Sequence, residues 1–163
     1  MRNLLFIATL SLFASASPAE ALICNIIGGC DCTVTASDVN FGAFSPLNGA
    51  QTAQGEITVD CTGVLDVLPA LAVKIGPGQW GSVSARKMRT SGGHELSYNL
   101  YGNSQHSIIW GDGTGGTSAY VVSGGLLTLG HWRVTQTIYG LASPTLATRP
   151  GAYNDLVTVR IDW

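Results

Sequence analysis

From residue 22 onward, the sequence is a succession of short segments in which polar and apolar residues alternate, separated by glycine-rich turns. The clearest examples are residues 56–61 (EITVDC) and residues 71–75 (LAVKI). Alternation with a period of two is typical of strands that bury one face, and helical periodicity is scarce in this part of the chain. The pattern therefore predicts an all-β protein.

About seven or eight such segments recur at regular spacing, which favours an antiparallel β-sandwich. No repeat, charge run or linker divides the chain after residue 22, and a length of 163 residues fits a single domain. The predicted strand regions are 33–41, with a kink near residues 37–38, and then 56–61, 71–75, 95–101 followed by 108–110, 135–141 and 156–163. Residues 120–122 and 126–129 are expected to be short strands or a hairpin around residues 124–125.

The composition excludes two classes of protein. Only 11% of the residues are charged and 45% are apolar, which is too apolar for a disordered chain. The net charge is −2 and only eight residues are basic, with one local cluster at Arg86, Lys87 and Arg89. Since nucleic-acid affinity rests largely on clustered lysine and arginine, we expect no nucleic-acid partner.

The first 21 residues have the three-part layout of a secretory signal peptide. A short basic start is followed by an apolar run at 4–13 and by small residues at 14–21, and we expect cleavage after Ala21, with residues 16–17 as the alternative. The apolar run is too short for a bilayer, which needs about 20 residues, and no second run follows. We therefore predict export, removal of residues 1–21, and a mature chain without a transmembrane segment.

Export would carry four cysteines, Cys24, Cys30, Cys32 and Cys61, into an oxidising compartment where disulfides persist. Four cysteines allow three pairings, and the spacing alone leaves either Cys30 or Cys32 able to reach Cys61. No pair has the gap of a zinc knuckle and the histidines lie far away in the sequence, so no metal site is expected.

No group of residues has the spacing of a catalytic site. Residues 111–116 (GDGTGG) fit a dinucleotide-binding pattern formally, but no helix-forming run follows, so we expect a glycine-rich loop. His94 and Glu95 are adjacent, so on a strand they would point to opposite faces. The chain is therefore not expected to be an enzyme or to hold a cofactor. The tryptophans are interpreted as packing residues rather than a sugar-binding surface: Trp80, Trp110, Trp132 and Trp163.

Several longer segments are distinctive in their order. They are CTVTA at 32–36 with VNFG at 39–42, GEITVDC at 55–61, LSYNLY at 96–101, WGDGTGG at 110–116, and PGAYND at 150–155 with VTV at 157–159. In this order they resemble the spore coat protein U domain family, and the segments YNLY and WGDGT together are quite specific. The resemblance spans about residues 32–163.

This resemblance implies a secreted subunit similar to the pilins of archaic chaperone–usher systems. Such pilins have an immunoglobulin-like sandwich that lacks its last strand. A periplasmic chaperone lends the strand, and the N-terminal extension of a neighbouring pilin subunit replaces it at an outer-membrane usher. For this chain the resemblance implies a subunit of a cell-surface fibre. It also implies a core disulfide between Cys32 and Cys61, which leaves Cys24 and Cys30 to pair locally.

If the family topology holds, an acceptor groove for the missing strand lies between the first and last predicted strands. The expected groove residues are Val34, Val39, Phe41, Val157, Val159, Ile161 and Trp163. Residues 22–31 are a short N-terminal extension with three candidate donor-strand residues: Leu22, Cys24 and Ile26. If a disulfide loops this extension, it donates nothing, and the subunit would cap a fibre or occupy its tip. The alternative function is a stand-alone secreted adhesin with a complete sandwich.

Overall fold

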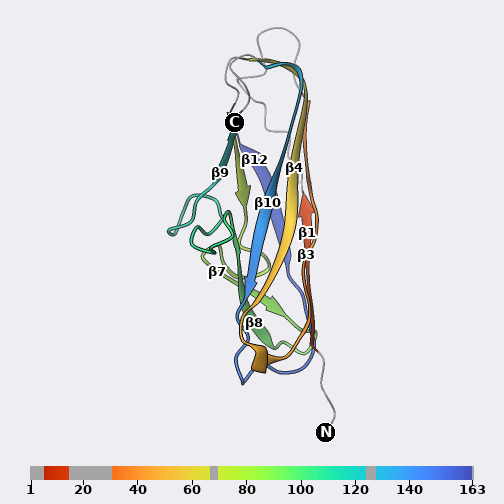
Figure 1. Ribbon diagram of the computed structural model, residues 1–163, viewed down its shortest axis with the longest axis vertical. Coiled ribbons are helices and arrows are strands. Elements are labelled where there is room, and N and C mark those ends of the chain that lie inside the picture. Colours follow the sequence, from red (N-terminus) through yellow and green to blue (C-terminus); the bar gives the residue numbers. More distant parts are fainter. Residues whose placement is uncertain (1–5, 15–30, 67–69, 124–127, 163) are drawn as a thin grey trace.

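The computed structural model describes residues 6–14, 31–66, 70–123 and 128–162. Within these ranges the chain forms strands and one short 3-10 helix, η2 (Pro46–Asn48). Figure 1 shows most of the strands running along the long axis of an elongated molecule. The prediction of an all-β, immunoglobulin-like sandwich is confirmed. In the same ranges, no helix is long and apolar enough to cross a membrane.

The described strands form two six-stranded sheets, which make up the sandwich. The first sheet contains, across its width, β3 (Val39–Phe44), β1 (Phe6–Ala14), β11 (Ala152–Tyr153) followed by β12 (Leu156–Asp162), β5 (Ala70–Ile75) and β9 (Tyr120–Ser123). The second contains β2 (Asp31–Ala36), β4 (Gln51–Asp66), β10 (Thr128–Ala142), β8 (Glu95–Tyr101), β7 (Ala85–Arg89) and β6 (Trp80–Ser82).

Alternate residues of both sheets point into one shared core. The residues of β4 that were predicted to share a face, Ile57, Val59 and Cys61, are each 1% exposed. At Gly140 of β10 the opposite sheet is too close for a side chain, because an added Cβ would lie 2.8 Å from Phe41 Cζ. The two sheets therefore pack in close contact where β3 faces β10.

The first predicted strand region bends at residues 37–38, as the sequence predicted. Before the bend β2 pairs with β4 in the second sheet, and after it β3 pairs with β1 in the first. Ser37 stabilises the bend, because its N–H donates to Glu56 O (2.9 Å) and its Oγ accepts from the Glu56 N–H (2.8 Å). One stretch of chain thus contributes to both sheets.

Other predicted strands have different bounds in the structure. The segments predicted at 56–61 and 135–141 are parts of the long strands β4 and β10, which pair along their whole described length. In place of the strand predicted at 108–110, Ile109 and Trp110 form isolated bridges. The short strands β6 and β7 were not predicted. Strand β7 buries an arginine where the alternating pattern would place an apolar residue.

Candidate strand-binding site

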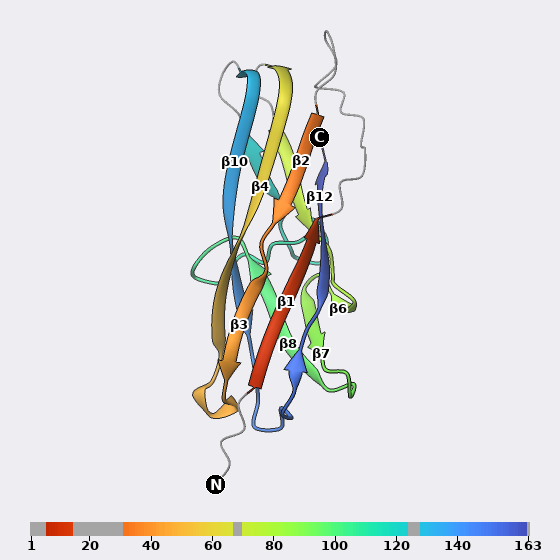
Figure 2. The same ribbon diagram turned by 90° about the vertical axis from the view of Figure 1, so that its right-hand side faces the viewer.

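Residues 6–14, which the sequence analysis assigned to a leader outside the fold, form strand β1 in the first sheet. Strand β1 is antiparallel to β3, beginning with Phe6 opposite Phe44. On its other edge β1 is parallel to β11 and β12, and this pairing ends with Ala14 opposite Val159. Figure 2 shows β1 lying between β3 and β12. The extended backbone of this segment is stabilised by backbone pairing along both of its edges.

Strand β1 joins β3 to the rest of the first sheet. Among the described residues, β3 pairs with no strand other than β1, and β12 pairs otherwise only with β5 on its far edge. Without β1, backbone N–H and C=O groups along β3 and β12 would have no partner, and such edges are a template for another extended chain. We call the position bounded by residues 39–44 and 152–159 the β1 site.

The structure places most of the predicted groove residues in the core next to β1. On β3, Val39 is fully buried and Phe41 is 6% exposed, while on β12 Val157 and Val159 are fully buried. Ile161 is only partly buried, and it lies beyond the register in which β12 pairs with β1.

One predicted groove residue has a different position. Val34 is buried, but it lies on β2 opposite Val59 of β4, so it belongs to the second sheet and is not paired with β1. The physical reason is the bend at residues 37–38, which moves the chain from one sheet to the other. The remaining predicted residues lie outside the described ranges: Trp163, Leu22, Cys24, Ile26 and Cys30.

Two residues beside the β1 site were missed by the sequence analysis. Phe44 is 5% exposed and lies opposite Phe6, and Tyr153 is fully buried and lies opposite Ala8. The Tyr153 hydroxyl donates to Arg149 O at 2.7 Å, which orients the ring. Tyr153 stands in the PGAYND segment that carried part of the family resemblance, so that segment was the available signal.

A disulfide joins Cys32 of β2 to Cys61 of β4, which is the pairing that the family resemblance implied. The two residues are directly opposite one another in the ladder, with a Cα–Cα distance of 4.1 Å. The bond therefore fixes the strand that continues into β3. In the described part of the chain no cysteine is free, and no group of three or more histidine, cysteine or acidic side chains could hold a metal ion.

A buried carboxylate fixes the start of β12. Asp155 is 2% exposed, and its Oδ2 accepts from the Tyr98 hydroxyl at 2.6 Å. Its Oδ1 accepts from the backbone N–H groups of Gln79 and Leu156, each at 2.8 Å. Burial raises the pKa of Asp155, and the hydrogen bond from Tyr98 opposes that shift. These contacts connect β8, the loop before β6 and the first residue of β12, which lies opposite Ser11 of β1.

A buried arginine connects the two sheets. The Arg86 guanidinium donates to Asn99 Oδ1 (2.5 Å), to Gly76 O (2.8 Å), and to the carbonyls of Ile75 and Trp110 (3.0 Å each). Burial lowers the pKa of Arg86 to about 10, so it remains charged at neutral pH. Arg86 belongs to the local basic cluster noted in the sequence, and it has no exposed surface. The other two members of the cluster, Lys87 and Arg89, both form ion pairs with Glu95.

Comparison with known families agrees with this architecture. The sequence profile of the Spore Coat Protein U domain matches residues 25–160. The chain belongs to the Spore Coat Protein U domain family. The resemblance that the sequence analysis noted is therefore confirmed. Strand β1 precedes the matched residues, so the described strands of the family domain itself are β2 to β12, and in these β3 has no strand partner of its own.

A solved structure has a similar fold. It is the crystal structure of the CsuC–CsuE chaperone–tip adhesion subunit pre-assembly complex from archaic chaperone–usher Csu pili of Acinetobacter baumannii. The match has a TM-score of 0.50 and 23% sequence identity, and it covers 82% of this Spore Coat Protein U domain chain. It spans 40% of the matched chain, so the whole of that protein is much longer than the shared domain. No curated protein sequence matches.

Proposed function

We propose that this chain is a structural subunit of a surface fibre, and that a strand from another chain completes its sandwich. The observation that carries the proposal is that the only described strand partner of β3 is β1, which precedes the family domain and falls within the expected leader. Removal of residues 1–21 on export would leave the β1 site open. The protein would then act by binding strands, without a chemical step, a cofactor or an enzymatic activity.

The free energy at stake explains why such a subunit would need a partner. Five apolar side chains on the strands that flank β1 are each less than 7% exposed while β1 is present: Val39, Phe41, Phe44, Val157 and Val159. Full burial of such a side chain is worth about 1.5–3 kcal/mol, so uncovering all five would cost at most about 7.5–15 kcal/mol. This range is similar to the whole stability of a typical domain, about 5–15 kcal/mol.

The geometry asks for an added strand, and the family resemblance suggests which partners would supply it. A periplasmic chaperone would supply the first strand, and the N-terminal extension of a neighbouring pilin subunit would replace it at an outer-membrane usher. Support comes from the similar fold in the Csu structure, which is a pre-assembly complex of a chaperone with a tip adhesion subunit. The product would be a fibre outside the cell that takes part in adhesion and biofilm formation.

The chain's own contribution to the next subunit depends on residues 22–31. If this extension is free, Leu22, Cys24 and Ile26 are its candidate donor residues. If Cys24 and Cys30 pair locally, the extension is looped, and the subunit would cap a fibre or occupy its tip. Disulfide mapping by mass spectrometry of the exported chain distinguishes these two arrangements.

The proposal is tested by refolding the full-length chain and residues 22–163 in parallel under oxidising conditions. We expect the full-length chain to be a stable monomer. Residues 22–163 should aggregate or melt many degrees lower, because the β1 site is then open. A chain of residues 22–163 that stays monomeric and unfolds at the same temperature would contradict the proposal and favour the stand-alone secreted adhesin.

A further inference from the structure

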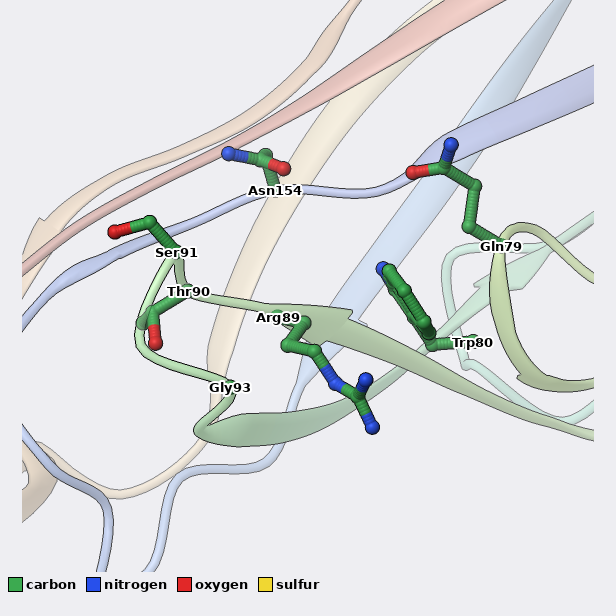
Figure 3. Close-up of a pocket in the computed structure, with 7 residues that line it drawn as sticks. All are labelled: Gln79, Trp80, Arg89, Thr90, Ser91, Gly93 and Asn154. Atoms are coloured by element: carbon green, nitrogen blue, oxygen red, sulfur yellow. The ribbon is translucent and has the colours of Figure 1, made fainter.

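A surface pocket of about 450 Å³ lies where the β6–β7 edge of the second sheet meets the link between β11 and β12. Figure 3 shows its lining, which includes Gln79, Trp80, Arg89, Ser91 and Asn154. The backbones of Arg89 and Asn154 are joined by two hydrogen bonds, Arg89 N–H to Asn154 O (2.9 Å) and Asn154 N–H to Arg89 O (3.2 Å). The relative positions of these two side chains are therefore set by regular backbone pairing.

The aromatic ring of the pocket is held in place on one face. The Arg89 guanidinium carbon lies 4.1 Å from the centroid of the Trp80 ring. Arg89 is in turn paired with Glu95 at 2.5 Å, and Glu95 also pairs with Lys87 at 2.6 Å. A cation stacked on an indole ring and anchored by a carboxylate restricts the ring to one orientation. Trp80 is half-buried, as is Trp132 of β10, whereas Trp110 is 1% exposed.

Several exposed amide and hydroxyl groups lie around the ring without a hydrogen-bond partner in the described part of the chain. The side chains of Gln79, Ser91 and Asn154 make no hydrogen bond with any residue in the described ranges, and the buried Nε of Arg89 also lacks a partner there. Figure 3 shows the nitrogen end of the Trp80 ring and the amides of Gln79 and Asn154 along the same side of the pocket. The pocket therefore offers amide and hydroxyl groups, both donors and acceptors, beside an aromatic ring.

We propose that this pocket binds a neutral sugar residue of a glycan. A saccharide presents hydroxyl groups that pair with amides and C–H faces that pack on an indole, and its size suits pockets of about 300–1,000 Å³. An anionic ligand fits less well, because Arg89 and Lys87 are already paired with Glu95. Fibre assembly is not needed for binding at this pocket, because every residue that lines it belongs to this one chain and the pocket is present while β1 is in place.

The test uses the full-length chain, which retains β1, and four probes: the methyl glycosides of glucose, galactose, mannose and N-acetylglucosamine. Saturation-transfer NMR is recorded at millimolar probe concentration, and any positive probe is titrated. We expect at least one probe to bind. The double variant Gln79→Ala/Asn154→Ala should weaken binding about tenfold or more, because two neutral hydrogen bonds are lost.

The matched control is Gln54→Ala, which removes an exposed amide from β4 outside the pocket and should leave binding unchanged. A second variant, Trp80→Phe, keeps an aromatic ring but removes the indole N–H, and should weaken binding without lowering the melting temperature. The proposal is overturned if none of the four probes gives saturation transfer. It is also overturned if the double variant binds a positive probe as tightly as the unmodified chain.

Discussion

Replacing Arg86 by leucine tests whether the buried guanidinium is a main contributor to the stability of the sandwich. The substitution removes the donors to three backbone carbonyls, those of Ile75, Gly76 and Trp110. Each buried polar group left without a partner costs about 1–3 kcal/mol, so three carbonyls correspond to about 3–9 kcal/mol. Relaxation and the recovered burial of an apolar side chain reduce this, and we expect a loss of about 3–5 kcal/mol.

The assay is urea denaturation of the full-length chain, followed by circular dichroism. The matched control is Arg133→Leu, because the Arg133 side chain is 63% exposed and its one ion pair within the described ranges is a long contact of 3.5 Å with Asp60. A surface substitution of this kind should change the free energy of unfolding by less than about 0.5 kcal/mol. If Arg86→Leu is as stable as Arg133→Leu, the hydrogen bonds of Arg86 do not stabilise the fold and the reasoning is wrong.

Three further predictions concern the core and its ionisation. Cys61→Ser should lower the free energy of unfolding by about 3–4 kcal/mol under oxidising conditions, and equal stability would remove the disulfide from the account. Gly140→Ala should cost about 1–3 kcal/mol through a clash with Phe41, whereas Gly92→Ala, where an added Cβ meets nothing closer than 3.7 Å, should have little effect. The raised pKa of Asp155 means that the folded state favours the protonated carboxyl. The stabilisation that this proton gives is therefore full below about pH 3.9, the ordinary pKa of an aspartate, and is lost as pH rises through the raised pKa. The stability of the unmodified chain relative to Asp155→Asn should therefore fall between acid and neutral pH, and a constant difference would contradict this assignment.

The strand pattern was predictable where the alternation is complete. The buried face of residues 57–61 and the bend at residues 37–38 follow from local sequence, because each depends on neighbours a few residues away. Strand β7 was not predictable, because Arg86 occupies one of its two buried positions and its partners come from β5, β8 and the loop at Trp110. Periodicity treats a charged residue as exposed, so a buried arginine with distant partners conceals a strand.

The site was predictable only in part, for a different reason. The two strands that flank β1 were expected from the family resemblance, and Val39 and Val157 lie there. That residues 6–14 would pair with them could not be expected, since an apolar leader segment carries no signal for the edges that it joins. Val34 was grouped with Val39 because the sequence gives the position of the bend but not the sheet to which each half belongs.

The most direct test of the central claim is amide hydrogen exchange on residues 22–163, with and without a synthetic peptide of residues 6–14. If the β1 site is an open strand-binding site, amides of β3 and of the first half of β12 exchange fast without the peptide and slowly with it. The long β4–β10 ladder serves as the internal reference. If β3 and β12 are already protected without the peptide, or if the peptide leaves their exchange unchanged, the sandwich needs no added strand and the account is wrong.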